Sequence, residues 1–168
     1  MAHHPLWHVC GAGLFLLLAA IHRRTRSCGV LAMVLWNLTG VILHELAHLL
    51  VGVLLRARPA GMSLMPRREG NGWCLGSVIF RRITAMNAVP VALAPLGLAG
   101  VAYWLARHWF SWCRPSFSAT LFLYAALFVL LYNALPSRRD LRVALNWRSI
   151  LVYTPLFAAV VWYFARPG

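Results

Sequence analysis

The sequence predicts an all-α polytopic membrane protein with about five transmembrane helices and a short β-hairpin. Hydrophobic residues make up 61% of the 168 residues, and the mean hydropathy is +0.70, far above that of an ordinary soluble domain. The apolar residues fall in five stretches, each close to the ~20 residues that a helix needs to cross a bilayer. Because no repeat, low-complexity tract or linker divides the chain, residues 1–168 are expected to form a single integral membrane domain.

The five helices are expected at about residues 5–21, 29–56, 85–107, 117–136 and 149–165. The first stretch could instead be a signal peptide. A retained helix is favoured, because no Lys or Arg precedes its apolar run and no clear cleavage site follows. The third stretch contains Pro90 and Pro95, and prolines can kink a membrane helix where neighbouring groups satisfy the freed carbonyls.

Residues 61–80, between the second and third helices, break the helical pattern and predict a hairpin. Two apolar arms, Met62–Met65 and Trp73–Phe80, flank a Gly70-Asn71-Gly72 turn signal, and the second arm is rich in β-branched and aromatic residues. Such backbone is tolerated at membrane depth only where protein or water covers it, so the hairpin is expected at the mouth of a site. An ordinary connecting loop is the alternative.

The charge of the chain is strongly positive. All 16 basic residues are arginines, and only three acids oppose them, which gives a formal net charge of +13. Nucleic-acid binding is not expected, because the arginines flank the apolar stretches, where anionic lipid headgroups and the positive-inside bias place them. The expected partner of these arginines is therefore a lipid bilayer with anionic headgroups.

The arginines are also unevenly divided between the two sides of the expected topology. Six lie at other flanks, and ten lie in residues 56–83 and 137–149: Arg56, Arg58, Arg67, Arg68, Arg81, Arg82, Arg138, Arg139, Arg142 and Arg148. This bias predicts a multi-pass protein, expected in a bacterial inner (plasma) membrane, with its N-terminus and these two segments on the cytoplasmic side.

The four cysteines do not predict a metal site, because they form no C-x-x-C pair and have no ligand spacing. In the expected topology Cys28 and Cys113 would both face outward, so a disulfide between them is left open. Unpaired thiols are the default expectation.

The most specific pattern is His44-Glu45-Leu46-Ala47-His48, an H-E-x-x-H motif inside the second apolar stretch. Histidines four residues apart project from one face of a helix, so both imidazoles can reach one metal ion, with the glutamate beside it. Ionisable side chains are costly at membrane depth, so their presence calls for a functional role. The motif predicts His44 and His48 as metal ligands, zinc (Zn2+) as the cofactor and Glu45 as the catalytic residue.

A catalytic zinc usually takes three protein ligands, so a third is required. Asp140 follows the fourth helix, on the side where the second helix ends, and is expected to be that ligand. Glu69 and His8 are rival ligands on the same side. The non-functional alternative for Asp140 is a weak surface ion pair with a neighbouring arginine: Arg138, Arg139 or Arg142.

With these motifs the chain resembles the site-2 protease family of intramembrane zinc metalloproteases. The resemblance spans Val30 to Asp140 and rests on the H-E-x-x-H helix, the glycine-containing hairpin directly after it, and Asn133-Ala-Leu-Pro136 followed by Asp140. In that family four residues separate the proline from Asp-Gly, whereas here three residues precede Asp140 and Leu141. A one-residue shift turns a helical side chain by about 100°, which a loop conformation could absorb.

The resemblance implies a hydrolase: a zinc metallopeptidase for intramembrane proteolysis of a transmembrane protein or peptide substrate near the cytoplasmic face. Zinc would be held by His44, His48 and Asp140, with Glu45 as general base, and the resemblance implies that Asn133 lies near the substrate backbone. The alternative is a non-catalytic membrane protein of the same fold that binds metal or a partner helix.

Overall fold

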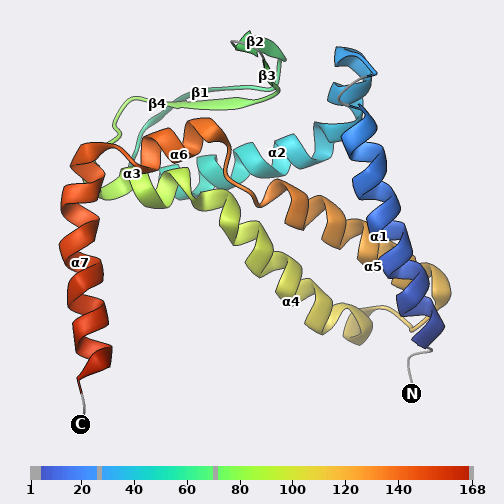
Figure 1. Ribbon diagram of the computed structural model, residues 1–168. Helices are drawn as coiled ribbons and strands as arrows, with labels where there is room; N and C mark the ends of the chain where they lie inside the picture. The colour runs from blue at the N-terminus through green and yellow to red at the C-terminus, as the bar shows by residue number, and fades with distance from the viewer. Residues whose placement is uncertain (1–4, 26–27, 70–71, 167–168) are drawn as a thin grey trace.

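The computed structural model describes residues 5–25, 28–69 and 72–166 and is mostly helical (Figure 1). Arg26 and the predicted turn residues Gly70 and Asn71 lie outside the described residues. The helices are α1 (Pro5–Thr25), α2 (Val30–Leu54), α3 (Ala85–Ala92), the 3-10 turn η1 (Ala94–Leu96), α4 (Gly97–Trp112), α5 (Phe117–Asn133), α6 (Arg138–Ala144) and α7 (Trp147–Ala165). The strands are β1 (Pro59–Ser63), β2 (Arg67–Glu69), β3 (Gly72–Cys74) and β4 (Ser77–Phe80).

Within the described chain, 3 helices, α1, α2 and α7, are long and apolar enough to cross a membrane. The number rises to 5 if α3 with α4, and α5 with α6, each form one bent span. The prediction of a helical, membrane-like fold with a small β element is confirmed at this level. The helix expected at 85–107 is divided into α3 and α4 with a bend of 40°, in the stretch that holds Pro90 and Pro95. The helix expected at 117–136 ends at Asn133, and a bend of 51° separates it from α6.

Helix α1 packs along α5 in the same direction. The ring centroid of His8, near the start of α1, lies 6.1 Å from that of Tyr124 and 6.3 Å from that of Phe110 at the end of α4. Near the end of α1, His22 contacts Tyr132 at 3.9 Å between centroids. The start of α1 therefore lies near the end of α4, and the start of α1 and the end of α7 lie away from the strands (Figure 1).

This parallel packing shows that one sequence-based expectation is wrong. The N-terminus and the end of α5 that leads into α6 were expected on the same side of the membrane, which requires α1 and α5 to be antiparallel. Instead, the end of α1, with Arg23 and Arg24 in its last turn, lies beside the end of α5. These two arginines therefore lie at the end of α5 that leads into α6, and the orientation of the chain in a membrane stays a prediction.

The predicted hairpin is present, as two short antiparallel pairs. β1 pairs with β4, with Met62 opposite Val78, and β2 pairs with β3, with Arg68 opposite Trp73. The ladder is interrupted between β1 and β2, where Pro66 has no N–H to donate. Figure 1 shows β1 and β4 lying over α2 and α6, with β2 and β3 beyond them.

A tight turn fixes the hairpin to the end of α2. The N–H of Ala57, which is fully buried, donates to the Gly52 carbonyl at 2.8 Å, and the Ala57 carbonyl accepts from the N–H of Arg82 at 2.9 Å. The ring of Phe80 at the end of β4 packs where Gly52 has no side chain. Helix α2 and strand β4 are thereby held as two walls of one site.

The α1–α5 packing can be tested with two glycines of one helix. A Cβ on buried Gly11 would lie 2.8 Å from Cγ of Tyr124, whereas a Cβ on Gly13 would meet nothing within 4 Å. Gly11→Ala should lower the free energy of unfolding in detergent by about 1–3 kcal/mol through overpacking. Gly13→Ala should leave it unchanged or raise it by up to ~1 kcal/mol. Equal stabilities of the two variants in thermal unfolding would contradict the packing.

Candidate metal centre

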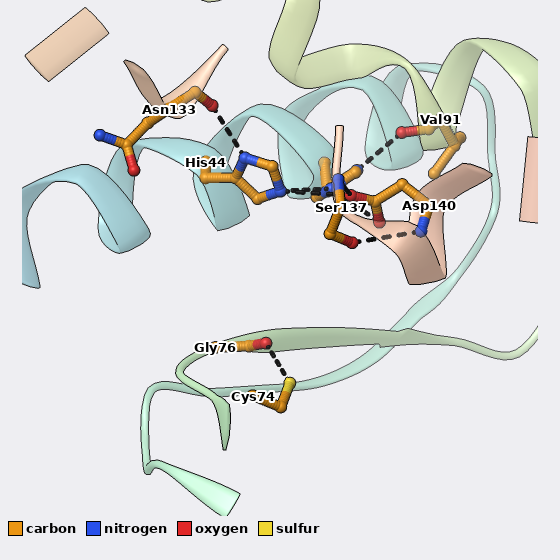
Figure 2. Close-up of polar contacts among 8 residues, drawn as sticks. His44, Cys74, Gly76, Val91, Asn133, Ser137 and Asp140 are labelled. Carbon is orange, nitrogen blue, oxygen red and sulfur yellow. Dashed lines mark hydrogen bonds and ion pairs between the residues drawn. The ribbon is translucent and has the colours of Figure 1, made fainter. Parts of the chain in front are cut away.

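The structure brings His44 and His48 of α2 together with Asp140 of α6 (Figure 2). The Nε2 atoms of His44 and His48 lie 3.2 Å apart, and the Asp140 carboxylate oxygens lie 3.3 Å from each of them, Oδ2 from His44 and Oδ1 from His48. A tetrahedral ion with bonds of ~2.0–2.1 Å requires ligand atoms about 3.3 Å apart. The two nitrogens and the carboxylate therefore form a triangle of the right size to hold a metal ion.

Each histidine binds a backbone carbonyl through its other ring nitrogen. Nδ1 of His44 donates to the Asn133 carbonyl at 2.9 Å, and Nδ1 of His48 donates to the Val91 carbonyl at 2.8 Å. Because a carbonyl can only accept, Nδ1 carries the hydrogen and Nε2 of the neutral ring presents a lone pair. In the neutral rings, two lone-pair nitrogens and a carboxylate thus face one another, an arrangement that could hold a metal ion.

Two helix breaks supply these carbonyls. Pro95, four residues after Val91, has no N–H, so it cannot form the helical hydrogen bond to the Val91 carbonyl. Helix α5 ends at Asn133, whose carbonyl is among those left without a helical partner. The N–H that would reach it from Ser137 donates instead to Asp140. The prolines at 95 and 136 are the sequence signal for both contacts, which the motif analysis missed.

Asp140 is oriented by a capping box at the start of α6. The Ser137 N–H donates to Asp140 Oδ2 at 2.7 Å, and the Asp140 N–H donates to Ser137 Oγ at 3.2 Å. The turn between Asn133 and Arg138 lets Asp140 face His44 and His48. Within the described chain, the ion pairs recorded for Asp140 join it to His44 and His48 rather than to a neighbouring arginine.

Of the two rival ligands, the structure describes the side chain of His8 but not that of Glu69. His8 lies beside Tyr124, with its Nδ1 3.4 Å from the tyrosine hydroxyl, and Tyr124 stands in the middle of α5, more than two helical turns before the end that leads to Asp140. Glu69 belongs to β2, and its side chain lies outside the described part of the chain. Of the described side chains, His44, His48 and Asp140 therefore form the candidate metal site.

Glu45 lies next to this triangle in a cavity of about 900 Å³. Its side chain is buried, with 7% of its surface exposed. The segment between β3 and β4 covers it so closely that a Cβ on Gly76 would lie 2.8 Å from Glu45 Cγ and 2.9 Å from Oε1. The cavity is also lined by the metal-site residues and by β4: His44, His48, Asp140, Ser77, Val78, Ile79 and Phe80. Gly76 is therefore a positioning residue that the motif analysis missed, although a glycine beside a strand commonly marks close backbone approach.

Asn133 also lines the cavity. Its side-chain amide donates to the Val129 carbonyl at 2.8 Å within α5, and the amide fills the space that Gly40 leaves open on α2. Its recorded link to the metal site is the backbone carbonyl that orients His44. The expected contact with a substrate backbone stays a prediction.

The cysteines take no part in the triangle. All four are free thiols, so the Cys28–Cys113 disulfide that the sequence left open is absent from the structure. Cys74 lines the cavity and donates its Sγ hydrogen to the Gly76 carbonyl at 3.0 Å. Its thiol is thereby engaged in holding the segment that covers Glu45.

No protein-family model, curated protein or solved structure matches the chain. The functional assignment below therefore rests on the motifs and on the geometry of this site.

The capping box predicts an effect of Ser137 on metal binding. Ser137→Ala removes the oxygen that accepts from the Asp140 N–H, so the carboxylate is held less firmly and metal affinity should fall about tenfold or more. Ser137→Thr keeps that oxygen and should bind metal like the wild type. Competition with a fluorescent zinc chelator measures both constants, and equal affinities of Ser137→Ala and the wild type would show that the box does not support the site.

Proposed function

We propose that this protein is a zinc-dependent intramembrane endopeptidase of the site-2 protease type. The observation that carries the proposal is the triangle of two neutral histidine nitrogens and a carboxylate, with a buried glutamate beside it, built on an apolar helix long enough to span a membrane. A structural metal site would not need Glu45 in the adjoining cavity. A hydrolytic site needs a base at this place.

Zinc is favoured over other metals by the donor set. Two imidazoles and one carboxylate form a frequent ligand set of catalytic zinc, which keeps its fourth position open. The three donor residues belong to α2 and α6, and all three line the cavity. The open position would therefore face the cavity, where a substrate and water can enter.

A bound zinc ion supplies Lewis acidity and makes water nucleophilic near neutral pH. Glu45 accepts a proton from the attacking water and then delivers a proton to the leaving amine. The hydroxyl of the water joins the carbonyl carbon as the C–N bond breaks, so the products are a carboxylate and an amine. The Asn133 and Val91 carbonyls accept from Nδ1 of His44 and His48, so Nε2 of each neutral ring would be the atom that holds the zinc.

The substrate class follows from the surroundings of the cavity. The H-E-x-x-H residues lie in α2, which is a candidate span, so the substrate is a transmembrane protein or peptide. A helix must unwind locally to expose its carbonyl. Strand β4 lines the cavity along its whole length, and an unwound segment lying beside it can be held extended by backbone hydrogen bonds.

The first test of this proposal replaces Glu45. Glu45→Gln keeps the size of the side chain but removes the base, so cleavage should fall by about 10²–10⁴-fold while zinc stays bound. The probe is a quenched fluorescent transmembrane peptide, ~20 residues long, with a Gly-Pro break in its helix, reconstituted with the protein in vesicles. Mass spectrometry identifies the products.

Glu69→Gln is the matched control, since it removes the other glutamate and should leave zinc content and cleavage unchanged. Peptide cleavage by Glu45→Gln at the wild-type rate would contradict the peptidase proposal. Zinc bound by a wild type that cleaves no transmembrane peptide would favour the non-catalytic metal-binding alternative.

A second test uses the glycine over Glu45. Gly76→Ala places a Cβ against the Glu45 side chain, so the rate constant for cleavage should fall about tenfold or more, because small misplacements of a catalytic group are costly. Zinc content should stay at the wild-type level. Gly61→Ala in the paired strand β1 is the control, since a Cβ there meets nothing within 4 Å. Equal kcat values for the two variants would show that Gly76 does not position the base.

A further inference from the structure

Three arginines of α6 line the same cavity as the metal triangle. Arg138, Arg139 and Arg142 are exposed to its opening, and they stand on the short helix that also carries Asp140. Residues 138, 139 and 142 occupy a sector of about 100° around a helix, whereas Asp140 turns away from Arg142 toward the histidines. One face of α6 thus binds the metal site, and the other lines the mouth of its cavity with positive charge.

Among the described side chains, no acid is recorded as neutralising this charge. The chain contains only three acids: Asp140 is bound to His44 and His48, Glu45 is buried beside them, and Glu69 belongs to β2. Within the described residues, no ion pair within 4.0 Å is recorded for the three α6 arginines. Arg139 and Glu45 line the same cavity, which places positive charge in the cavity that holds the proposed base.

The remaining lining of the cavity suits a peptide. Opposite the arginines, β4 contributes Val78, Ile79 and Phe80, an apolar wall in extended conformation. A phospholipid headgroup on the outer surface would meet arginines of the hairpin and loops, but it would not need arginines inside the cavity that holds Glu45. A bound segment with carboxylates would satisfy both the arginines and the apolar wall.

We propose that the site selects transmembrane substrates whose membrane-flanking segment, next to the cleaved bond, carries acidic side chains that pair with Arg138, Arg139 and Arg142. This inference rests on the proposed peptidase function and adds the charge of its substrates. Flanks of most membrane proteins on the cytoplasmic side are rich in Lys and Arg. The α6 arginines repel such flanks, so the same charges that attract an acidic segment exclude the common basic one.

The test measures binding apart from cleavage. Three fluorescent transmembrane peptides differ only in a flank of three residues, Glu, Gln or Lys, and their affinities for Glu45→Gln protein are measured in neutral phosphatidylcholine vesicles by anisotropy. The Glu peptide should bind about tenfold more tightly than the Lys peptide, and the difference should shrink at high salt. Cleavage of the same peptides by the wild type is recorded separately.

Replacing Arg138, Arg139 and Arg142 together by Gln should reduce the affinity ratio to about one, with zinc content unchanged. The matched control, Arg67→Gln with Arg68→Gln in β2, should keep the ratio. Equal binding of the three peptides by the parent protein would overturn the inference, even if all three are cleaved. A ratio that vanishes when phosphatidylglycerol is added would also overturn it, because the arginines would then serve lipid headgroups. A preserved preference without cleavage would refute the peptidase proposal while leaving the charge selection in place.

Discussion

The convergence of two histidine lone pairs and one carboxylate is the constraint on which the rest of the structure depends. Two ring nitrogens and a carboxylate at 3.2–3.3 Å from one another repel unless a proton or a metal ion lies between them. Holding them together requires α2 for the histidines, α6 for Asp140, and the ends of α3 and α5 for the carbonyls that bind each Nδ1. Four helices are therefore oriented by one small site, and binding of a metal ion is expected to stabilise their arrangement.

The breaks in the helices are part of this design. A straight helix satisfies its own carbonyls and has none to offer a histidine. The helix break at Pro95 and the end of α5 before Pro136 leave carbonyls free beside the imidazoles of α2. The capping box of Ser137 turns the Asp140 carboxylate back toward those imidazoles. The bends of 40° and 51° thus supply the groups that set the tautomers and aim the third ligand. The same bend exposes the other face of α6 to the cavity.

Much of this could be predicted from local patterns. The apolar stretches and the hairpin follow from hydropathy and turn residues, and the juxtaposition of His44, His48 and Asp140 follows from helix periodicity and the scarcity of acids. The direction of α1 was not predicted, because arginine counts carry no information on contacts between helices such as that of Gly11 with Tyr124. The roles of the Val91 carbonyl and of Gly76 were also missed, since a backbone group or a missing side chain leaves no motif. The ligand and catalytic roles stay predictions.

The most direct test of the account is the metal content of the purified protein. Elemental analysis would compare detergent-purified wild type with His44→Ala, Asp140→Ala and the control His108→Ala, after circular dichroism has shown that each is folded. His108 lies on the exposed surface of α4. The wild type and His108→Ala should each contain one zinc. Both ligand variants should lose it. A folded Asp140→Ala protein that retains its zinc, or a folded wild type that contains no zinc and takes none up, would contradict the three-ligand site and the hydrolytic function built on it.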